Sequence, residues 1–192
     1  GERLFTGMIR DITARKRIED ALREARDRFR SIFDHAPIGV AMVSLEGRYL
    51  QVNRSLCEIL GYTEEELQAL TWQEITHPDD LAASSAYARR IVEGEFPKYH
   101  LEKRFLHADG HTVWASLSVS LVRDAEGEPL YFVSQIQDIT ERKRFEEAHE
   151  RLSRQHKMVL EAVGEGIFGL DLHGNVTFVN PAASDMTEWN TQ

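Results

Sequence analysis

The sequence is poor in residues that build cross-linked or membrane-spanning proteins. Its 192 residues include a single cysteine, Cys57, which excludes an internal disulfide and a cysteine-rich zinc site. The longest apolar run, 38–43, is far shorter than the ~20 residues that cross a bilayer, and no signal peptide is evident. A formal net charge of −9 disfavours nonspecific contact with nucleic acid or anionic lipid. We therefore expect a cytoplasmic protein with no nucleic-acid partner and no direct membrane contact.

Catalytic signatures are also missing. No phosphoacceptor histidine box, ATP-binding glycine-rich motif or cyclase signature occurs, so this chain is not expected to be an enzyme by itself. Apolar neighbours indicate that Cys57 is a core thiol. His77, which stands before Pro78 and two aspartates, is explained by helix capping rather than by a metal. His107 and His111 flank an Asp-Gly turn and are expected to form a surface pair rather than a ligand set, so no metal site is predicted.

The chain repeats part of itself at a fixed offset of 127 residues. Asp11 to Arg17 returns as Asp138 to Arg144 (138 − 11 = 127), and Val52-Asn53 returns as Val179-Asn180 without a gap. Further pairs at this offset are Phe5 and Phe132, Ile9 and Ile136, Gly39 and Gly166, and Gly47 and Gly174. A period of about 130 residues is the length of a small domain with its connector, so the chain is predicted to belong to a domain array.

One complete unit is expected between two incomplete ones. The predicted division is a final strand of a preceding unit at 1–13, a connector helix at 14–33, a complete domain at 34–140, a second connector helix at 141–160 and the first part of a following domain at 161–192. Within the complete domain, turn and alternation patterns predict two strands, a cluster of helices and then three strands. This order predicts an α+β fold, with helices on one face of a five-stranded antiparallel sheet.

The first connector helix carries an apolar residue at every third or fourth position among charged ones. These residues are Ile18, Leu22, Ala25, Phe29 and Ile32. The spacing is that of a coiled coil and predicts a homodimer seam; the alternative is an amphipathic helix packed on its own domain. In the second connector helix, the 127-residue offset places His149 and His156 where Leu22 and Phe29 stand. A rotated register there uses Ala148, Leu152, Val159 and Ala162 instead.

Several short motifs occur together in the complete unit. They are Gly39, Gly47, Val52-Asn53, Gly61-Tyr62-Thr63-x-Glu65-Glu66-Leu67, His77-Pro78-Asp79-Asp80, Glu102-x-Arg104, Asp109-Gly110-x-x-x-Trp114 and Asp138-Ile139-Thr140-Glu141-Arg142-Lys143. Over residues 26–144 this set resembles the PAS sensor family with its C-terminal PAC part. The resemblance implies a dimeric module that senses a small ligand or redox state upstream of an output domain. We expect that output to be a sensor histidine kinase, in preference to a diguanylate cyclase or phosphodiesterase.

The resemblance also implies a joint between the last strand and the outgoing helix. In the family, an Asp-Ile-Thr triplet at the strand end is where the sheet moves that helix. The triplet occurs twice here, and the expected joint residues are Asp11, Thr13, Asp138 and Thr140. A threonine at this place also caps the helix, with Asp138 pairing a following arginine, so the triplet is either a cap alone or a cap and a switch.

A ligand pocket is expected between the helices and the sheet. Trp72, Tyr87 and Phe105 are the predicted lining residues, unless they simply fill the core. The long helix carries Ser84, Ser85 and Tyr87 where a haem-binding histidine would stand, so haem is not expected, and flavin remains open although the photoreactive cysteine motif is absent. The predicted function is a sensory and dimerisation module. The alternative is a structural spacer that holds dimer geometry and binds nothing.

Overall fold

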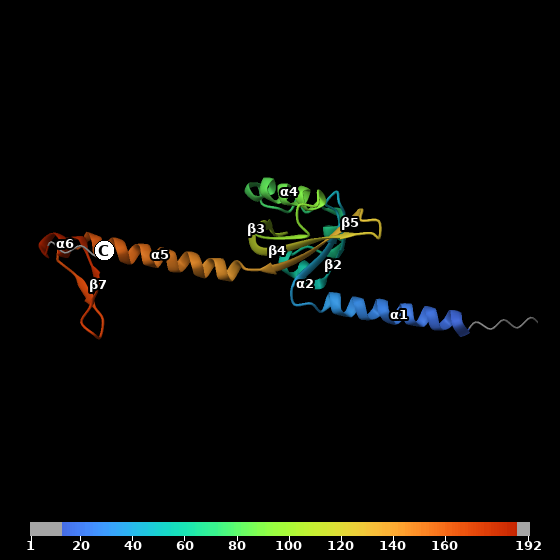
Figure 1. The fold of residues 1–192 in the computed structure, drawn as a ribbon, viewed down its shortest axis with the longest axis horizontal. Coiled ribbons are helices and arrows are strands. Elements are labelled where there is room, and N and C mark those ends of the chain that lie inside the picture. The colour runs from blue at the N-terminus through green and yellow to red at the C-terminus, as the bar shows by residue number, and fades with distance from the viewer. Residues whose placement is uncertain (1–12, 188–192) are drawn as a thin grey trace, which may run out of the picture. The chain divides into compact units, whose positions relative to one another are not determined.

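The computed structural model describes residues 13–187, with side chains from Lys16 onward. In chain order (Figure 1) the elements are α1 (Thr13–Asp34), β1 (Gly39–Val43), β2 (Tyr49–Val52), α2 (Arg54–Leu60), α3 (Glu64–Ala69), α4 (Pro78–Val92), β3 (Lys98–Leu106), β4 (Thr112–Arg123), β5 (Pro129–Asp138), α5 (Thr140–Ala162), β6 (Phe168–Leu170), β7 (Val176–Val179) and α6 (Pro181–Thr187). The chain divides into two compact units, with the division between Ile139 and Thr140. The strand expected at 1–13 lies outside the described residues up to Ile12, and Thr13 begins α1 instead.

The first unit contains a five-stranded antiparallel sheet. Its strand order is β2-β1-β5-β4-β3, so the two strands of the first hairpin join the last three strands through the β1–β5 pair. Helix α4 lies over one face of this sheet (Figure 1), and α2 and α3 pack against β1 and β2. This arrangement confirms the predicted α+β fold. It also places a layer of core side chains between the helices and the sheet.

Strand β4 shows why the sheet has one core face. Its side chains alternate between buried and partly exposed, as the sequence pattern predicts for a strand covered on one side only. The inward residues are Val113, Ala115, Leu117 and Val119. Ala115, Leu117 and Val119 form one hydrophobic cluster with Phe105 and Ile136 from the neighbouring strands and with Leu56, Leu60 and Leu67 from the helices.

Local capping signals fix where the short helices begin and end. Asn53 accepts a hydrogen bond from the backbone of Leu56 and starts α2, which stops at Gly61 in a left-handed conformation with φ of 77°. Thr63 and Glu66 form the predicted capping box at the start of α3. Each helix therefore begins and ends as its sequence indicates.

The second unit consists of α5, the β6–β7 hairpin and α6. The two strands pair only with each other among the described residues, and their apolar side chains are largely exposed. Phe168, for example, retains 61% of its accessible surface. Within residues 13–187, none of the helices combines the length and the apolar content that a membrane span requires.

Candidate functional site

A small internal cavity lies between α4 and the inward face of the sheet. Its volume is about 30 Å³, and its lining residues are Tyr49, Trp72, Ser84, Ala88, Tyr99, Lys103, Phe105, Leu117, Phe132 and Ile136. A buried water needs ~10–15 Å³ of such space, so the cavity has room for one or two groups of that size. A wider hollow of about 830 Å³ runs along α5, but residues of that single helix line it, so it encloses nothing.

The buried amine of Lys103 dominates the chemistry of this cavity. Lys103 is 2% exposed, and its Nζ donates a hydrogen bond of 2.8 Å to the hydroxyl of Thr76. The same nitrogen lies 4.3 Å from the ring centroid of Phe105 and 4.9 Å from that of Trp72. Burial lowers the pKa of Lys103 to about 7, against an opposing influence from the charge of Asp80. Aromatic faces and one hydroxyl are therefore its main compensation for lost water.

Another polar group at the cavity, unlike Lys103, has no hydrogen-bond partner. The hydroxyl of Ser84, on α4, is buried and makes no hydrogen bond with the described residues. Tyr99 also lines the cavity, and burial raises the pKa of its phenol to about 12. Ammonium and hydroxyl donors thus share a space whose walls are mostly carbon. A buried donor without an acceptor costs roughly 1–3 kcal/mol, so this cavity favours an occupant that accepts hydrogen bonds.

Two of the three predicted pocket residues line the cavity. Trp72 and Phe105 do so, whereas Tyr87 is not among the lining residues. Tyr87 is 36% exposed and stacks on Tyr99, with ring centroids 5.4 Å apart. Lys103 is a further lining residue that the sequence analysis does not name. Its position in β3 could have indicated it, because Tyr99, Leu101, Lys103 and Phe105 are every second residue and share one face of the strand.

The cavity does not fit the cofactors weighed from the sequence. Ligand sites for flavin-sized molecules enclose ~300–1,000 Å³, at least about ten times the 30 Å³ found here. Haem is excluded by the same volume, although the lining includes Tyr49 and Tyr99, whose phenols belong to a class that ligates haem iron. The site suits a much smaller occupant.

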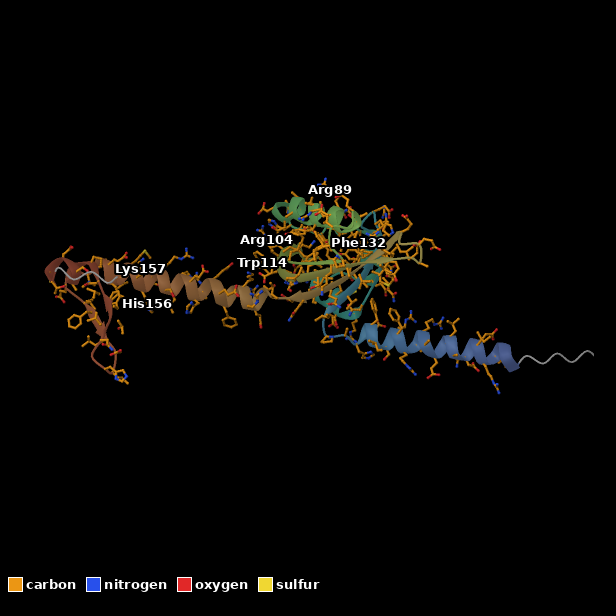
Figure 2. All side chains as sticks on the ribbon, in the orientation of Figure 1. Arg89, Arg104, Trp114, Phe132, His156 and Lys157 are labelled. Atoms are coloured by element: carbon orange, nitrogen blue, oxygen red, sulfur yellow. The ribbon has the colours of Figure 1, made fainter. Side chains whose placement is uncertain are left out.

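Arg104 connects the start of α4 to strand β3 beside the cavity. Its guanidinium contacts both oxygens of the Asp80 carboxylate, at 3.0 and 2.8 Å, and its backbone N–H donates to the same group at 2.8 Å. These hydrogen bonds lower the pKa of Asp80. Arg104 also lies over the ring of Trp114, 5.4 Å from its centroid (Figure 2). An ion pair between Asp80 and Arg104 therefore connects the motif His77-Pro78-Asp79-Asp80 to the motif Glu102-x-Arg104.

At the entry to the domain, the amide of Asn53 joins three elements. Asn53 is fully buried, and its Oδ1 accepts hydrogen bonds from the backbone N–H groups of Val40 and Leu56. Its Nδ2 donates to the carbonyl oxygens of Phe33, at 3.0 Å, and Ile38, at 2.9 Å. Phe33 lies in the last turn of α1. One side chain therefore attaches the incoming helix to β1 and α2.

At the exit, strand β5 leads into α5 with a single residue between them. Asp138 ends β5 opposite Ala115, and Thr140 begins α5. Between them Ile139 is 7% exposed, and its N–H donates to the carbonyl of Trp114 at 2.9 Å. The strand is thus held to the sheet up to the residue before the helix. The roles predicted for Asp138 and Thr140 stay predictions; of the first copy of the triplet, Asp11 lies outside the described residues.

The predicted dimer seam is exposed on α1. Ile18 and Leu22 each retain 70% of their surface, Ile32 69% and Phe29 51%, and Ala25 is also exposed. Among the α1 side chains from Lys16 onward, only Phe33, at the end of the helix, is buried. The apolar stripe is therefore not covered by the described residues of its own chain.

Cys57 lies on α2 at the edge of the core. Its thiol is free and partly buried, and burial followed by the nearby charge of Glu64 raises its pKa. A raised pKa keeps the thiol protonated and slow to react. This environment disfavours Cys57 as a redox sensor.

The fold and the interior site define a PAS module, and comparison with known proteins agrees. Residues 49–136 match one family model described as PAS fold, and residues 155–192 match another. A solved PAS domain of a protein from Colwellia psychrerythraea has 21% identity and a TM-score of 0.56, covering 62% of this chain and 98% of that one. The chain belongs to the PAS family of sensor domains, and it carries the PAS fold.

Its curated relatives are much longer signalling proteins. The chain is 42% identical over 153 residues to the probable diguanylate cyclase DgcE of Escherichia coli K12, covering 80% of this chain and 14% of that protein. It is 27% identical over 182 residues to the sensor histidine kinase TmoS of Ectopseudomonas mendocina, covering 93% of this chain and 18% of that protein. The chain is thus similar to a small part of each relative.

Proposed function

We propose that residues 34–140 form a complete sensory PAS unit between two connector helices, and that it detects a small hydrogen-bond acceptor inside its core. The observation that carries this proposal is the cavity at Lys103, where buried donors face a space of about 30 Å³. An anion or neutral acceptor of two or three atoms, seated against the amine and the Ser84 hydroxyl, supplies the interactions that those donors lack.

The relay runs along β5. Phe132 and Ile136 on this strand line the cavity, and Ile136 is followed after one residue by Asp138, the last residue of the strand. A change in cavity occupancy shifts these side chains, because a packed core transmits small displacements. The triplet of Asp138, Ile139 and Thr140 then sets the register at which the outgoing helix leaves the domain.

Dimerisation through the connector helices supports such a relay. The five seam positions of α1 form an apolar stripe flanked by charged residues, which is the pattern of a parallel coiled coil. Two copies of the chain bury this stripe against each other. Pairing through α1 fixes the incoming helix, so that the shift along β5 is passed to the outgoing helix α5.

The parent protein is proposed to carry a catalytic output domain and to act in the cytoplasm. The 42% identity to a probable diguanylate cyclase exceeds the 27% to a histidine kinase, so the cyclase stands ahead of the kinase, which reverses the order expected from the sequence alone. A spacer that binds nothing is the second candidate, and the small volume of the cavity favours it.

Native mass spectrometry of the purified chain, together with output assays of the full-length parent, separates the two functions. We expect a bound small species that is lost in Lys103→Met and kept in Lys98→Met, the exposed control on the same strand. Lys103→Met should also fix the output activity at one level, and Asp138→Ala and Thr140→Ala should reduce its response. A chain without bound species, in a parent whose activity none of these variants changes, is a spacer.

A further inference from the structure

The hairpin between β3 and β4 brings two imidazoles and a carboxylate together. His107 follows β3, His111 precedes β4, and Asp109-Gly110 make the turn between them, with Gly110 at φ of 92°. The two imidazole rings stack with centroids 4.2 Å apart and planes inclined by 26°. The histidines therefore face each other across the turn, as the sequence indicates.

The ligand atoms of the three side chains converge. Nδ1 of His107 lies 2.9 Å from Oδ1 of Asp109, and Nδ1 of His111 lies 2.5 Å from the same oxygen. All three ligand atoms are within 4.8 Å of one another.

An ordinary hairpin turn accounts for part of this geometry only. Oδ1 of Asp109 accepts from the backbone N–H of His111 at 3.1 Å, which is the usual role of an aspartate before glycine in a turn. That role needs no imidazole on either side. Each ring adds a hydrogen bond of its own: Nδ1 of His107 accepts from the backbone N–H of Asp109 at 3.2 Å, and Nδ1 of His111 hydrogen-bonds Oδ1 of Asp109. These contacts hold both imidazole nitrogens beside the carboxylate.

We propose that His107, Asp109 and His111 form a binding site for a divalent transition metal of the zinc, copper or nickel class. Two imidazole nitrogens and one carboxylate oxygen are ligands that such ions prefer, whereas Mg²⁺ and Ca²⁺ prefer oxygen alone. Around an ion bound at ~2.0–2.1 Å, neighbouring ligand atoms lie roughly 2.9–3.4 Å apart. His107 and Asp109 already have this separation. His111, half exposed, needs to move outward by less than about 1 Å.

The site has one fixed ligand and two adjustable ones. The His107 side chain is 19% exposed and lies against Gly61, where an added Cβ would overlap the imidazole ring. The next residue, Ala108, donates its N–H to the carbonyl of Leu60 at 2.9 Å. Asp109 and His111 are exposed at 64% and 51%. A bound ion therefore keeps positions open to water and links the hairpin to the end of α2.

Calorimetric titration of the untagged chain with zinc sulfate tests the site. We expect one equivalent to bind, and Asp109→Asn and His111→Gln each to weaken binding at least about tenfold. Asp109→Asn keeps the turn acceptor and removes only the charge. His100→Gln, on the same hairpin but outside the cluster, is the matched control and should bind zinc as the native chain does.

Absorption of the cobalt-substituted chain gives a second measurement, because bands in the visible region report imidazole and carboxylate ligation directly. His107→Gln should abolish these bands while circular dichroism shows an intact fold; if it unfolds, the exposed His111→Gln still decides. No zinc binding at millimolar concentration overturns the proposal. Binding that survives both Asp109→Asn and His111→Gln overturns it too, because the ion then belongs to other histidines.

Discussion

Asn53 and Asn180, one in each unit, make the same set of hydrogen bonds at the 127-residue offset. Asn180 accepts from the N–H groups of Ile167 and Ala183 and donates to the carbonyl of Leu160 at 3.1 Å, as Asn53 does to that of Phe33. Both asparagines are fully buried. The surrounding hairpins differ: β1 and β2 belong to a five-stranded sheet, whereas β6 and β7 pair only with each other among the described residues.

This difference separates what is local in the fold from what is not. The asparagine network needs only the end of a helix, a hairpin and the first turn of the next helix, all within about 25 residues. Burial of the hairpin needs strands that follow much later in the chain. Phe168 and Leu170 of β6 repeat Ala41 and Val43 of β1. They are 61% and 55% exposed, because among the described residues no strand pairs with β6 as β5 pairs with β1. The asparagine network can thus form fully in a unit whose hairpin is not buried in a core.

The largest effect is expected from removing one of the two amides. Asn53→Ala should lower the free energy of unfolding of the first unit by about 3 kcal/mol or more, because it leaves buried backbone groups without partners. Urea denaturation followed by circular dichroism measures it. Asn180→Ala is the matched control and should leave that transition unchanged. A difference below about 0.5 kcal/mol for Asn53→Ala would mean that packing, and not the network, holds the entry.

Asn53→Asp gives a finer test of the same network. Aspartate keeps the acceptor for Val40 and Leu56 and loses the donors to Phe33 and Ile38. We expect it to preserve α2 and to weaken the attachment of α1. Hydrogen exchange should show faster opening at the end of α1 than in α2; equal changes in both helices would contradict a division of labour within the amide.

The next effect concerns the buried amine that only the complete unit contains. The pKa of Lys103 falls from 10.5 in the free side chain to about 7 in the fold, so between these values the unfolded chain binds the extra proton. Stability should therefore rise from pH 7 to pH 10 by roughly 3 kcal/mol from this group, and be lowest below pH 7.

Lys103→Met should remove that rise and stabilise the domain at pH 6, because an apolar side chain of similar length replaces a buried cation. Denaturant midpoints across this pH range measure the change. Lys98→Met, at an exposed position of the same strand, controls for the general effect of losing a lysine. Parallel pH profiles for Lys103→Met and the native chain would show that the amine is hydrated in the folded state.

A smaller effect is expected from placing a charge in the apolar stripe of α1, which α5 does not repeat at His149 and His156. Leu22→Glu should weaken dimerisation at least about tenfold, since it places a charge in the apolar stripe. Sedimentation equilibrium measures it, and Arg23→Glu, beside the stripe, is the control. An unchanged oligomer in Leu22→Glu would assign the stripe of α1 to something other than a second copy.

The smallest effect comes from exchanging Cys57 for its counterpart at the 127-residue offset, Ser184. Cys57→Ser should change the free energy of unfolding by about 1 kcal/mol or less, because the thiol is only partly buried and makes no disulfide. In the native chain, iodoacetamide should modify Cys57 more slowly at pH 8 than it modifies free cysteine, because the raised pKa keeps the thiolate scarce. Fast alkylation would return Cys57 to the candidates for redox sensing.

Much of the fold was readable because its signals are local. Asn53, Gly61 and Thr63 begin or end helices by hydrogen bonds within a few residues, and the alternation in β4 marks its core face directly. Such features depend on residues that are close in sequence, so pattern and geometry agree.

The interior site was only partly readable because it depends on distant residues. Tyr87 was predicted to line the pocket, but its position on α4 turns it toward Tyr99 and Phe96 instead. Lys103 is the unspecified position of the Glu102-x-Arg104 motif and has no predicted role. Its burial follows from its place on the inward face of β3, together with the cover that α4 and Trp72 provide. Charge alone predicts exposure, and only the packed structure shows the exception.

The placement of the asparagine amide inside each unit bears on how such arrays grow in evolution. Each of the two units contains the asparagine that hydrogen-bonds to the helix preceding its first hairpin. A duplicated unit therefore carries its own attachment and requires no new residue in the unit before it. The grip is on backbone carbonyls, at Phe33 and at Leu160, and backbone does not change when the helix sequence does. The helix side chains can therefore differ without loss of this attachment, as Leu22 and His149 do at the 127-residue offset.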